Sequence, residues 1–259
     1  MTAKISCIIP VCDRMEFLPD AIQSALNQSV RPHEIIVVNN GRAAATLGDD
    51  LREQVEIFNF LPYAGVAQAL NFGSSLATGD FLAFLEDDDF WNEDYLRNVL
   101  DAVRSGPECV VSRIDKMVGH EISDYKNSDG KLSIANLLTH NPGVTITNTV
   151  VSKKLHFAIG GFDPKLLTSA DRSFIIEILR SGASVMTLPE NSAIGRFHTS
   201  ARLGKHYGSL YESNYQFTRK YSHMMTFGQK LLNRRKILHY RYKHFISRIL
   251  NTNPYMKSR

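Results

Sequence analysis

The sequence predicts an α/β fold in which a mostly parallel β-sheet is flanked by helices and followed by a basic helical extension. Two continuous apolar runs, 5–11 and 34–40, have the length of strands and the β-branched composition of parallel strands covered on both faces. The segment 15–30 between them carries apolar residues at helical spacing, which completes a βαβ unit. Strand and helix patterns alternate over the first 115 residues, as is typical of an α/β sheet.

Each predicted element has its own pattern. Short apolar runs predict strands at 5–11, 34–40, 55–60, 80–86, 144–151 and 183–189. Periodic apolar residues predict helices at 15–30, 64–79, 92–106, a short stretch from 155, and 169–182. Asn92 is a candidate cap for the third helix, and Gly106 followed by a proline ends it. The polar, turn-rich region 115–143 is expected to be a loop or lid.

Length and composition limit the class of protein. With 259 residues, 43% hydrophobic and 22% charged, the chain can form one large domain or one domain plus an extension. Its three cysteines do not make a disulfide framework, which favours a reducing compartment. There is no apolar run of about 18 residues and no N-terminal segment long enough for a secretory signal. We therefore expect a cytoplasmic protein.

Charge is divided unevenly along the chain. Residues 213–259 contain 11 Lys or Arg and no acid, whereas the rest has an excess of seven acids. Apolar residues at mixed three-, four- and seven-residue spacing make the segment 227–249 a basic amphipathic helix, which suits an anionic membrane surface. Packing on the acidic body, or on a second subunit to give a homo-oligomer, is an open alternative. Nucleic acid is not an expected partner, because no nucleic-acid-binding module is recognisable.

Four consecutive acids, Glu86 to Asp89, end the apolar strand predicted at 80–86. Because adjacent carboxylates repel one another, such a cluster forms either a solvated turn before the next helix or a site beside a positive charge. A hard divalent cation such as Mg²⁺ or Mn²⁺ prefers oxygen ligands of this kind. The chain has no G-x-G-x-x-G after its first strand and no G-x-x-x-x-G-K-[ST]. Neither a dinucleotide site nor a P-loop is therefore predicted.

Several motifs occur in an order that resembles one known family. They are "CIIPVCDR", "EIIVVNNG", "AGVAQALNFGSSLATGDFLAFLEDDDFW", "GGFDPKL" and "ADRSFIIEIL". Over residues 3–200 the chain resembles family 2 glycosyltransferases, which have the GT-A fold. The resemblance implies a GT-A domain at 1–204, with a nucleotide-binding half at 1–115, an acceptor half at 116–204, and a basic helical extension at 205–259. It also implies a nucleotide-diphospho-sugar donor and a Mn²⁺ or Mg²⁺ cofactor.

In this family the acids after the fourth strand form a D-x-D-D motif, which binds the ribose and the metal on the diphosphate of the donor. When the motif is aligned on Trp91, Glu86 takes its first position and Asp87 is the intervening residue. The resemblance implies that both contact the nucleotide-sugar. Asp88 takes the metal position and Asp89 the position after it. A register slipped by one residue, with Asp87 and Asp89 as the pair, stays open.

Other positions match the family's nucleotide and metal contacts. The resemblance implies further nucleotide-sugar contacts at Pro10, Val11, Arg14, Asn39 and Asn71, and a further metal contact at His198. Asn39 replaces the usual base-binding Asp, so the identity of the base is open, and a turn role beside Gly41 is its alternative. Asn71 could instead be a solvent-facing polar residue of a helix, and His198 a structural histidine.

The resemblance implies an inverting transfer, in which an acceptor hydroxyl attacks the anomeric carbon as the nucleoside diphosphate leaves. A carboxylate must take the proton of that hydroxyl, and Asp171 matches the family's base position. Ala170 stands beside it where a second acid is common. The alternative role for Asp171 is that of an acid stabilised by the dipole at a helix N-terminus.

We therefore expect a metal-dependent inverting glycosyltransferase with a UDP-linked donor and a saccharide or lipid-linked saccharide acceptor, peripheral on the inner face of a membrane. The alternative is a non-catalytic nucleotide-sugar-binding protein that keeps the fold. Four departures from the family's pattern keep this alternative open: Asn39, Asn40, Leu70 and Ala170. Leu70 stands where the family usually has Arg. A nucleotidyltransferase fits less well, because its Gly- and Arg/Lys-rich loop after the first strand is missing.

Overall fold

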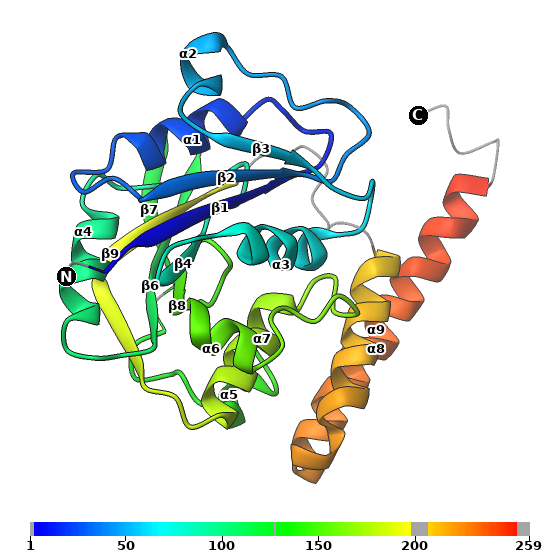
Figure 1. The fold of residues 1–259 in the computed structure, drawn as a ribbon. Helices are drawn as coiled ribbons and strands as arrows, with labels where there is room; N and C mark the ends of the chain where they lie inside the picture. The colour runs from blue at the N-terminus through cyan, green and yellow to red at the C-terminus, as the bar shows by residue number, and fades with distance from the viewer. Residues whose placement is uncertain (1–2, 127, 198–206, 253–259) are drawn as a thin grey trace.

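A computed structural model of the chain describes residues 3–126, 128–197 and 207–252. Its centre is one mixed β-sheet, and the described residues contribute nine strands to it. The strand order is β3-β2-β1-β4-β8-β6-β9-β5, with β7 paired to β6 outside this path. Helices cover both faces of the sheet (Figure 1), which confirms the α/β class.

The N-terminal half of the sheet is parallel. Its strands are β1 (Ile5–Val11), β2 (Glu34–Asn39), β3 (Glu56–Asn59) and β4 (Phe81–Phe84). All seven residues of β1 are buried, because helices pack on both faces of this strand. Ile8 faces one core together with Ile36 and Phe84, while Cys7 and Ile9 face the other. The continuous apolar run predicts this two-sided burial correctly.

The second half of the sheet mixes directions. β8 (Thr149–Ser152) lies antiparallel between β4 and β6 (Cys109–Val118). β9 (Val185–Arg196) is parallel to β6, and the short β5 (Phe90–Trp91) pairs antiparallel with the end of β9. β5 follows the acidic segment directly, so the sheet holds this segment from both sides.

The helices divide between the two faces. The helices of the first half are α1 (Leu18–Leu26), α2 (Asp49–Arg52), α3 (Val66–Leu76) and α4 (Tyr95–Val103). Those of the second half are α5 (Ile134–Leu137), α6 (Lys153–Ala158) and α7 (Ala170–Arg180). Apolar residues of α1 and α4 fill one core, and those of α3 and α7 fill the other.

The basic extension is helical, as expected. It contains α8 (Tyr207–Tyr221), a short 3₁₀ turn (Ser222–Met224) and α9 (Phe227–Thr252). α8 and α9 form an antiparallel pair along one side of the molecule (Figure 1). Phe217 and Tyr221 of α8 are fully buried in the core that also contains α7, so this extension packs on the body. No helix in the described part of the chain is both long and apolar enough to cross a membrane.

The expectation of a loop or lid at 115–143 is wrong in its first part. β6 continues to Val118, and β7 (Glu121–Lys126) returns along it as an antiparallel hairpin. Gly119, at φ 62°, provides the positive φ that this tight turn requires. The hairpin is polar and largely exposed, so it carries little of the apolar pattern by which a strand is predicted.

Two other boundaries differ from the sequence patterns. The strand predicted at 144–151 pairs only from Thr149, because the Asn148 side chain bonds to Thr145, Gly143 and Ser112 and holds a turn before it. Asn92 does not cap α4, which begins at Tyr95. The Asn92 amide instead donates to Ser192 Oγ at 2.8 Å and ties this segment to β9.

Candidate active site

The four acids form a tight turn at the carboxyl end of β4. Pairing with β1 continues to the amide of Leu85, which donates to Ile8 O at 3.0 Å, and the amide of Asp89 closes the turn on Glu86 O at 3.1 Å. Asp87, Asp88 and Asp89 are buried and Glu86 is half-buried. We call Glu86 to Asp89 the acid turn. It lies at the edge where open α/β sheets bind ligands.

Burial and mutual repulsion raise the pKa values of Glu86 and Asp87 in this turn. Burial, followed by the charges of Asp89, Asp88 and Asp87, raises the pKa of Glu86 well above its usual range. Burial also raises the pKa of Asp87 to about 6, although Arg14 opposes that shift. The turn therefore concentrates negative charge that the protein itself neutralises only in part.

Arg14 supplies a positive charge from the loop after β1. Its guanidinium contacts Asp87 through Nη2 at 2.5 Å and Nε at 3.4 Å. The same Nη2 lies 3.1 Å from Asp88 Oδ2. Arg14 thus links the loop after β1 to the acid turn that follows the neighbouring strand β4.

Neutral donors hold Asp89. Thr147 Oγ1 donates to Asp89 Oδ2 at 2.7 Å, and the amide of Arg196 donates to Oδ1 at 3.0 Å. The carbonyl of Thr147 also accepts from Trp91 Nε1 at 2.8 Å. Thr147 thus fixes both ends of the segment 89–91, a role that sequence reasoning missed because Thr147 and Asp89 are 58 residues apart.

Asp171 lies in the first turn of α7 and is half-buried. Its Oδ1 accepts from the amide of Arg172 at 2.6 Å, and its Oδ2 accepts from Asn141 Nδ2 at 3.1 Å. Burial raises the pKa of Asp171 despite these bonds. The charge of Asp171 also contributes to the raised pKa of Glu86, so the structure brings the acid turn and the start of α7 into electrostatic contact.

Comparison with known proteins decides the family. The model of "Glycosyl transferase family 2" matches residues 6–163, more than half of the chain. The chain belongs to glycosyl transferase family 2. The family-model match includes the acid turn, Arg14 and the strands that carry them, but it ends before Asp171.

Relatives agree with this family membership, and a solved structure shares the fold. "Uncharacterized glycosyltransferase RC0461" of Rickettsia conorii is 25% identical over 198 residues, covering 68% of this chain and 31% of the relative. An uncharacterized glycosyltransferase of Haemophilus influenzae is 23% identical over 187 residues, covering 68% of this chain and 62% of the relative. The chain therefore spans less than two thirds of either relative.

The structure of S. aureus TarS 1–349 in complex with UDP-GlcNAc has a TM-score of 0.65 at 13% identity, covering 93% of this chain and 72% of TarS 1–349. At that identity the likeness shows the fold alone, and it confirms the GT-A architecture.

The acid turn of this family 2 chain fits a divalent cation. Its carboxylate oxygens are hard ligands, and a bound cation would favour the charged forms of Glu86 and Asp87, which burial and the neighbouring acids disfavour. In the described ranges, no three His, Cys, Asp or Glu side chains are arranged as metal ligands. Such an ion would be held by one or two carboxylates with water and phosphate oxygens, as Mg²⁺ commonly is. His198 lies outside the described residues.

Three of the residues expected to contact the nucleotide, Pro10, Val11 and Asn39, are buried in the structure. Asn39 is buried, with its Nδ2 donating to Ala43 O at 2.8 Å and its Oδ1 accepting from the amide of Gly41 at 3.0 Å. The turn role beside Gly41 is therefore present. Pro10 and Val11 are buried in β1, and Val11 packs in the core that α1 and α4 fill. Their role in binding a nucleotide stays a prediction.

Asn71 joins α3 to the glycine turn that precedes α7. Its Nδ2 donates to Phe162 O at 2.8 Å, and its Oδ1 accepts from the amide of Phe162 at 2.8 Å. The solvent-facing alternative for Asn71 is therefore wrong. Gly161, at φ 69°, leaves room for this contact, because a Cβ there would collide with Asn71 Oδ1.

Asp13 holds loops together beside the acid turn, a role that sequence reasoning missed. It follows β1 at φ 55°, and its Oδ1 accepts from the amides of Arg42 and Ala43 at 2.7 and 2.9 Å. Its Oδ2 accepts from Tyr63 OH at 2.6 Å. These bonds tie the loops after β1, β2 and β3 together beside Arg14. The sequence gives no signal for this role, because the partners Arg42 and Tyr63 lie 29 and 50 residues farther along the chain.

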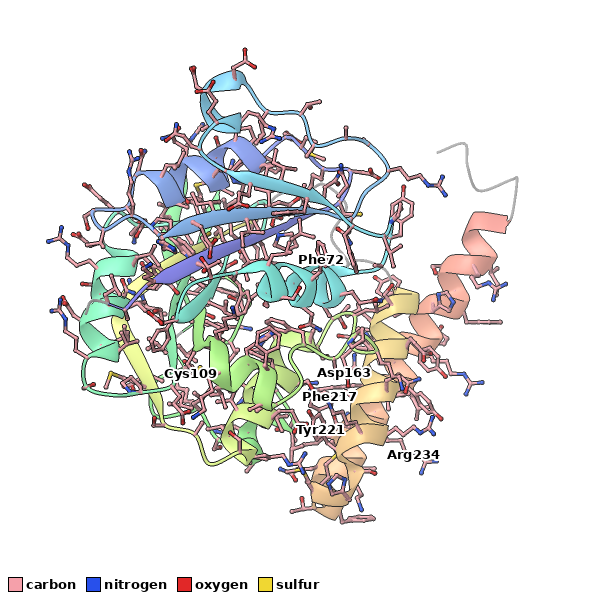
Figure 2. All side chains as sticks on the ribbon, viewed as in Figure 1. Phe72, Cys109, Asp163, Phe217, Tyr221 and Arg234 are labelled. Atoms are coloured by element: carbon pink, nitrogen blue, oxygen red, sulfur yellow. The ribbon has the colours of Figure 1, made fainter. Side chains whose placement is uncertain are left out.

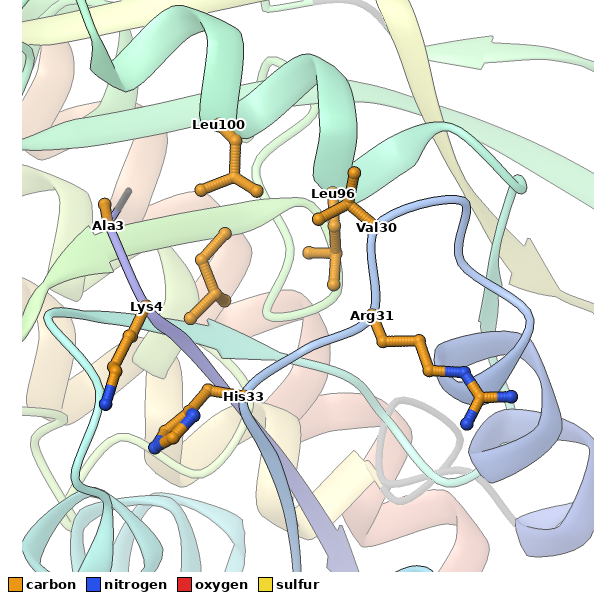
Figure 3. A pocket seen from close by; sticks show the side chains of 8 residues that line it. Ala3, Lys4, Val30, Arg31, His33, Leu96 and Leu100 are labelled. Carbon is orange, nitrogen blue, oxygen red and sulfur yellow. The ribbon is translucent and has the colours of Figure 1, made fainter. Parts of the chain in front are cut away.

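A hollow at the opposite edge of the sheet is not part of this site. Figure 3 shows it lined by Ala3 and Lys4 before β1, by Val30, Arg31 and His33 before β2, and by Leu96 and Leu100 of α4. These positions lie at the amino ends of β1 and β2. A ligand of an open α/β sheet is expected at the carboxyl ends, where the acid turn lies.

Proposed function

We propose that this chain is an inverting glycosyltransferase that moves a sugar from a nucleotide-diphospho-sugar to a saccharide or lipid-linked saccharide. One observation carries the proposal: Arg14 pairs with Asp87 and Asp88 of the acid turn, and the charge of Asp171 acts on Glu86 of the same turn. A positive charge, a carboxylate cluster and a separate half-buried carboxylate are the groups that such a transfer requires.

The donor would lie between Arg14 and the acid turn. Asp88 would hold Mn²⁺ or Mg²⁺, with Asp89 beside it, while Glu86 and Asp87 would face the nucleotide-sugar. When bound, the cation supplies positive charge to the departing diphosphate, so that a second protein acid is not needed. Arg14 can exchange its carboxylate partners for phosphate oxygens, because a guanidinium binds both in the same forked geometry.

The acceptor hydroxyl would be activated by Asp171. The hydroxyl oxygen forms the new bond to the anomeric carbon, the bond from that carbon to the diphosphate oxygen breaks, and Asp171 receives the proton. The amide of Arg172 and Asn141 fix the orientation of its carboxylate. Burial raises the pKa of Asp171, which makes it a better proton acceptor than an ordinary Asp.

UDP is the first nucleotide to test. S. aureus TarS shares the fold and its structure is described in complex with UDP-GlcNAc. In this chain both polar groups of Asn39 already bond to the loop after β2, so we expect other atoms to contact the base.

The experiment compares Asp171→Asn with the wild type. We expect turnover of the UDP-sugar that the wild type uses to fall by about 10²–10⁴-fold, while UDP binding stays within twofold, because only the proton acceptor is lost. Asp101→Asn, an exposed acid on α4, is the matched control and should change neither quantity. Turnover in Asp171→Asn close to the wild-type value would refute the assignment of the base.

The rival is a non-catalytic nucleotide-sugar-binding protein, and one specific observation favours it. Ala170 places no second acid beside Asp171. A wild type that binds UDP in the presence of Mn²⁺ but turns over none of the UDP-, GDP- or dTDP-sugars would establish this rival.

A further inference from the structure

α9 presents two different faces. Its inner face docks on the body: Gln229 Nε2 donates to Ala135 O at 3.0 Å, and Asn233 Nδ2 donates to Leu138 O at 2.9 Å. Lys236 Nζ bonds to Thr139 O next to them. Farther along, the ring of His244 packs close to Gly208 of α8. These contacts recur at three-, four- and eight-residue intervals, so they define one side of the helix.

The outer face is apolar and exposed. We call its large apolar residues the α9 stripe: Phe227, Leu231, Leu238, Tyr242 and Phe245. At about 3.6 residues per turn they cluster on the side of α9 opposite Asn233. Phe227 is 84% exposed, and the other four are between 52% and 62% exposed. Single exposed apolar residues are ordinary, but a stripe along one helix marks an interaction surface.

Basic residues flank the α9 stripe. Lys230, Arg234 and Arg241 lie along one side of it and Arg235 along the other, and all four are exposed. In Figure 2, Arg234 points away from the body, whereas Phe217 and Tyr221 of α8 lie toward it. α9 carries seven Lys or Arg and no acid. The partner of this face must therefore accept both apolar side chains and a high density of positive charge.

We infer that the outer face of α9 lies on an anionic lipid surface, with the α9 stripe inserted among the acyl chains and the flanking bases at the headgroups. A helix of 26 residues with this arrangement is typical of interfacial helices, which lie in the membrane plane. Lys and Arg beside the stripe are attracted by anionic headgroups.

Charge favours lipid over a second copy of the chain. Two α9 stripes packed face to face would bring their basic flanks together, and α9 offers no acid to pair with them. An anionic bilayer neutralises the flanks and buries the stripe at the same time. This inference does not depend on the proposed transfer, but it would place the enzyme where a lipid-linked acceptor is found.

The test is flotation of the full chain with phosphatidylcholine vesicles that either contain or lack phosphatidylglycerol. We expect the wild type to float with the anionic vesicles, to remain unbound with the neutral ones, and to be released by high salt. The double variant Leu238→Ser/Phe245→Ser should reduce binding to the anionic vesicles by about tenfold or more, since both apolar anchors are lost. Arg234→Gln/Arg241→Gln should also weaken it.

The control changes equally exposed apolar residues elsewhere. Leu61→Ser/Ile122→Ser, in the loop after β3 and in β7, should float like the wild type. Light scattering of each protein after size exclusion measures its oligomeric state. A wild type that does not float with the anionic vesicles, or a stripe variant that floats as well as it does, would overturn the inference. A dimer that the stripe variant dissociates, without vesicle binding by the wild type, would assign the face to a second copy instead.

Discussion

At the scale of single residues, burial raises the pKa values of acids in the site and lowers the pKa of a histidine in the core. Glu86, Asp87 and Asp171 have raised pKa values because burial disfavours their charged forms. His156 is buried among the rings of Phe84, Phe162 and Phe174, and its Nδ1 has no hydrogen-bond partner among the described residues. Burial lowers the pKa of His156 to about 4, so it is a neutral core residue at physiological pH.

His156 makes the stability of the fold depend on pH. Between pH 6.5 and about 4 the unfolded chain protonates this histidine and the folded chain does not, so the free energy of unfolding falls as the pH falls. The shift corresponds to roughly 3 kcal/mol at the acidic limit. His156→Leu should remove this part of the slope, as urea titrations at several pH values would measure. If the free energy of unfolding of His156→Leu depended on pH as steeply as that of the wild type, His156 would not be the source of this pH dependence.

At the scale of elements, the apolar patterns predict the parallel strands and the main helices because the sheet is covered on both faces. The β6–β7 hairpin escapes prediction because β7 is polar and exposed, and β5 escapes it because this two-residue strand is defined only by its pairing with the distant β9. The acid turn and Arg14 are predictable from motif order. Thr147, Asp13 and Asn141 are not, because isolated polar residues in loops gain their role only from partners far along the chain.

The hydrogen bonds of Asn71, which join α3 to the turn before α7, allow a prediction at the scale of elements. Asn71→Ala leaves both the amide and the carbonyl of buried Phe162 without their partner, and should lower the free energy of unfolding by about 1–3 kcal/mol. Ser75→Ala, on an exposed part of the same helix, should cost less than about 0.5 kcal/mol. If urea unfolding showed the same loss of stability for Asn71→Ala and Ser75→Ala, the hydrogen bonds of Asn71 would contribute little.

At the scale of the whole molecule, the fold brings chemistry from widely separated segments to one edge of the sheet. The ends of β1 and β4 meet through Arg14 and the acid turn, and the start of α7 adds Asp171. α8 buries Phe217 and Tyr221 against α7, so the C-terminal helices are part of the body as well as the carriers of a basic surface. The proposed function requires that the acid turn bind the diphosphate of a nucleotide through a divalent cation.

Calorimetric titration with UDP, with and without Mn²⁺, tests this claim most directly in the wild type and in Asp88→Asn. We expect UDP binding by the wild type to require Mn²⁺, and the affinity of Asp88→Asn to fall at least about tenfold, or 1.4 kcal/mol. Asp101→Asn should bind like the wild type. Binding of UDP that is equally strong without a divalent cation, and unchanged in Asp88→Asn, would contradict the account.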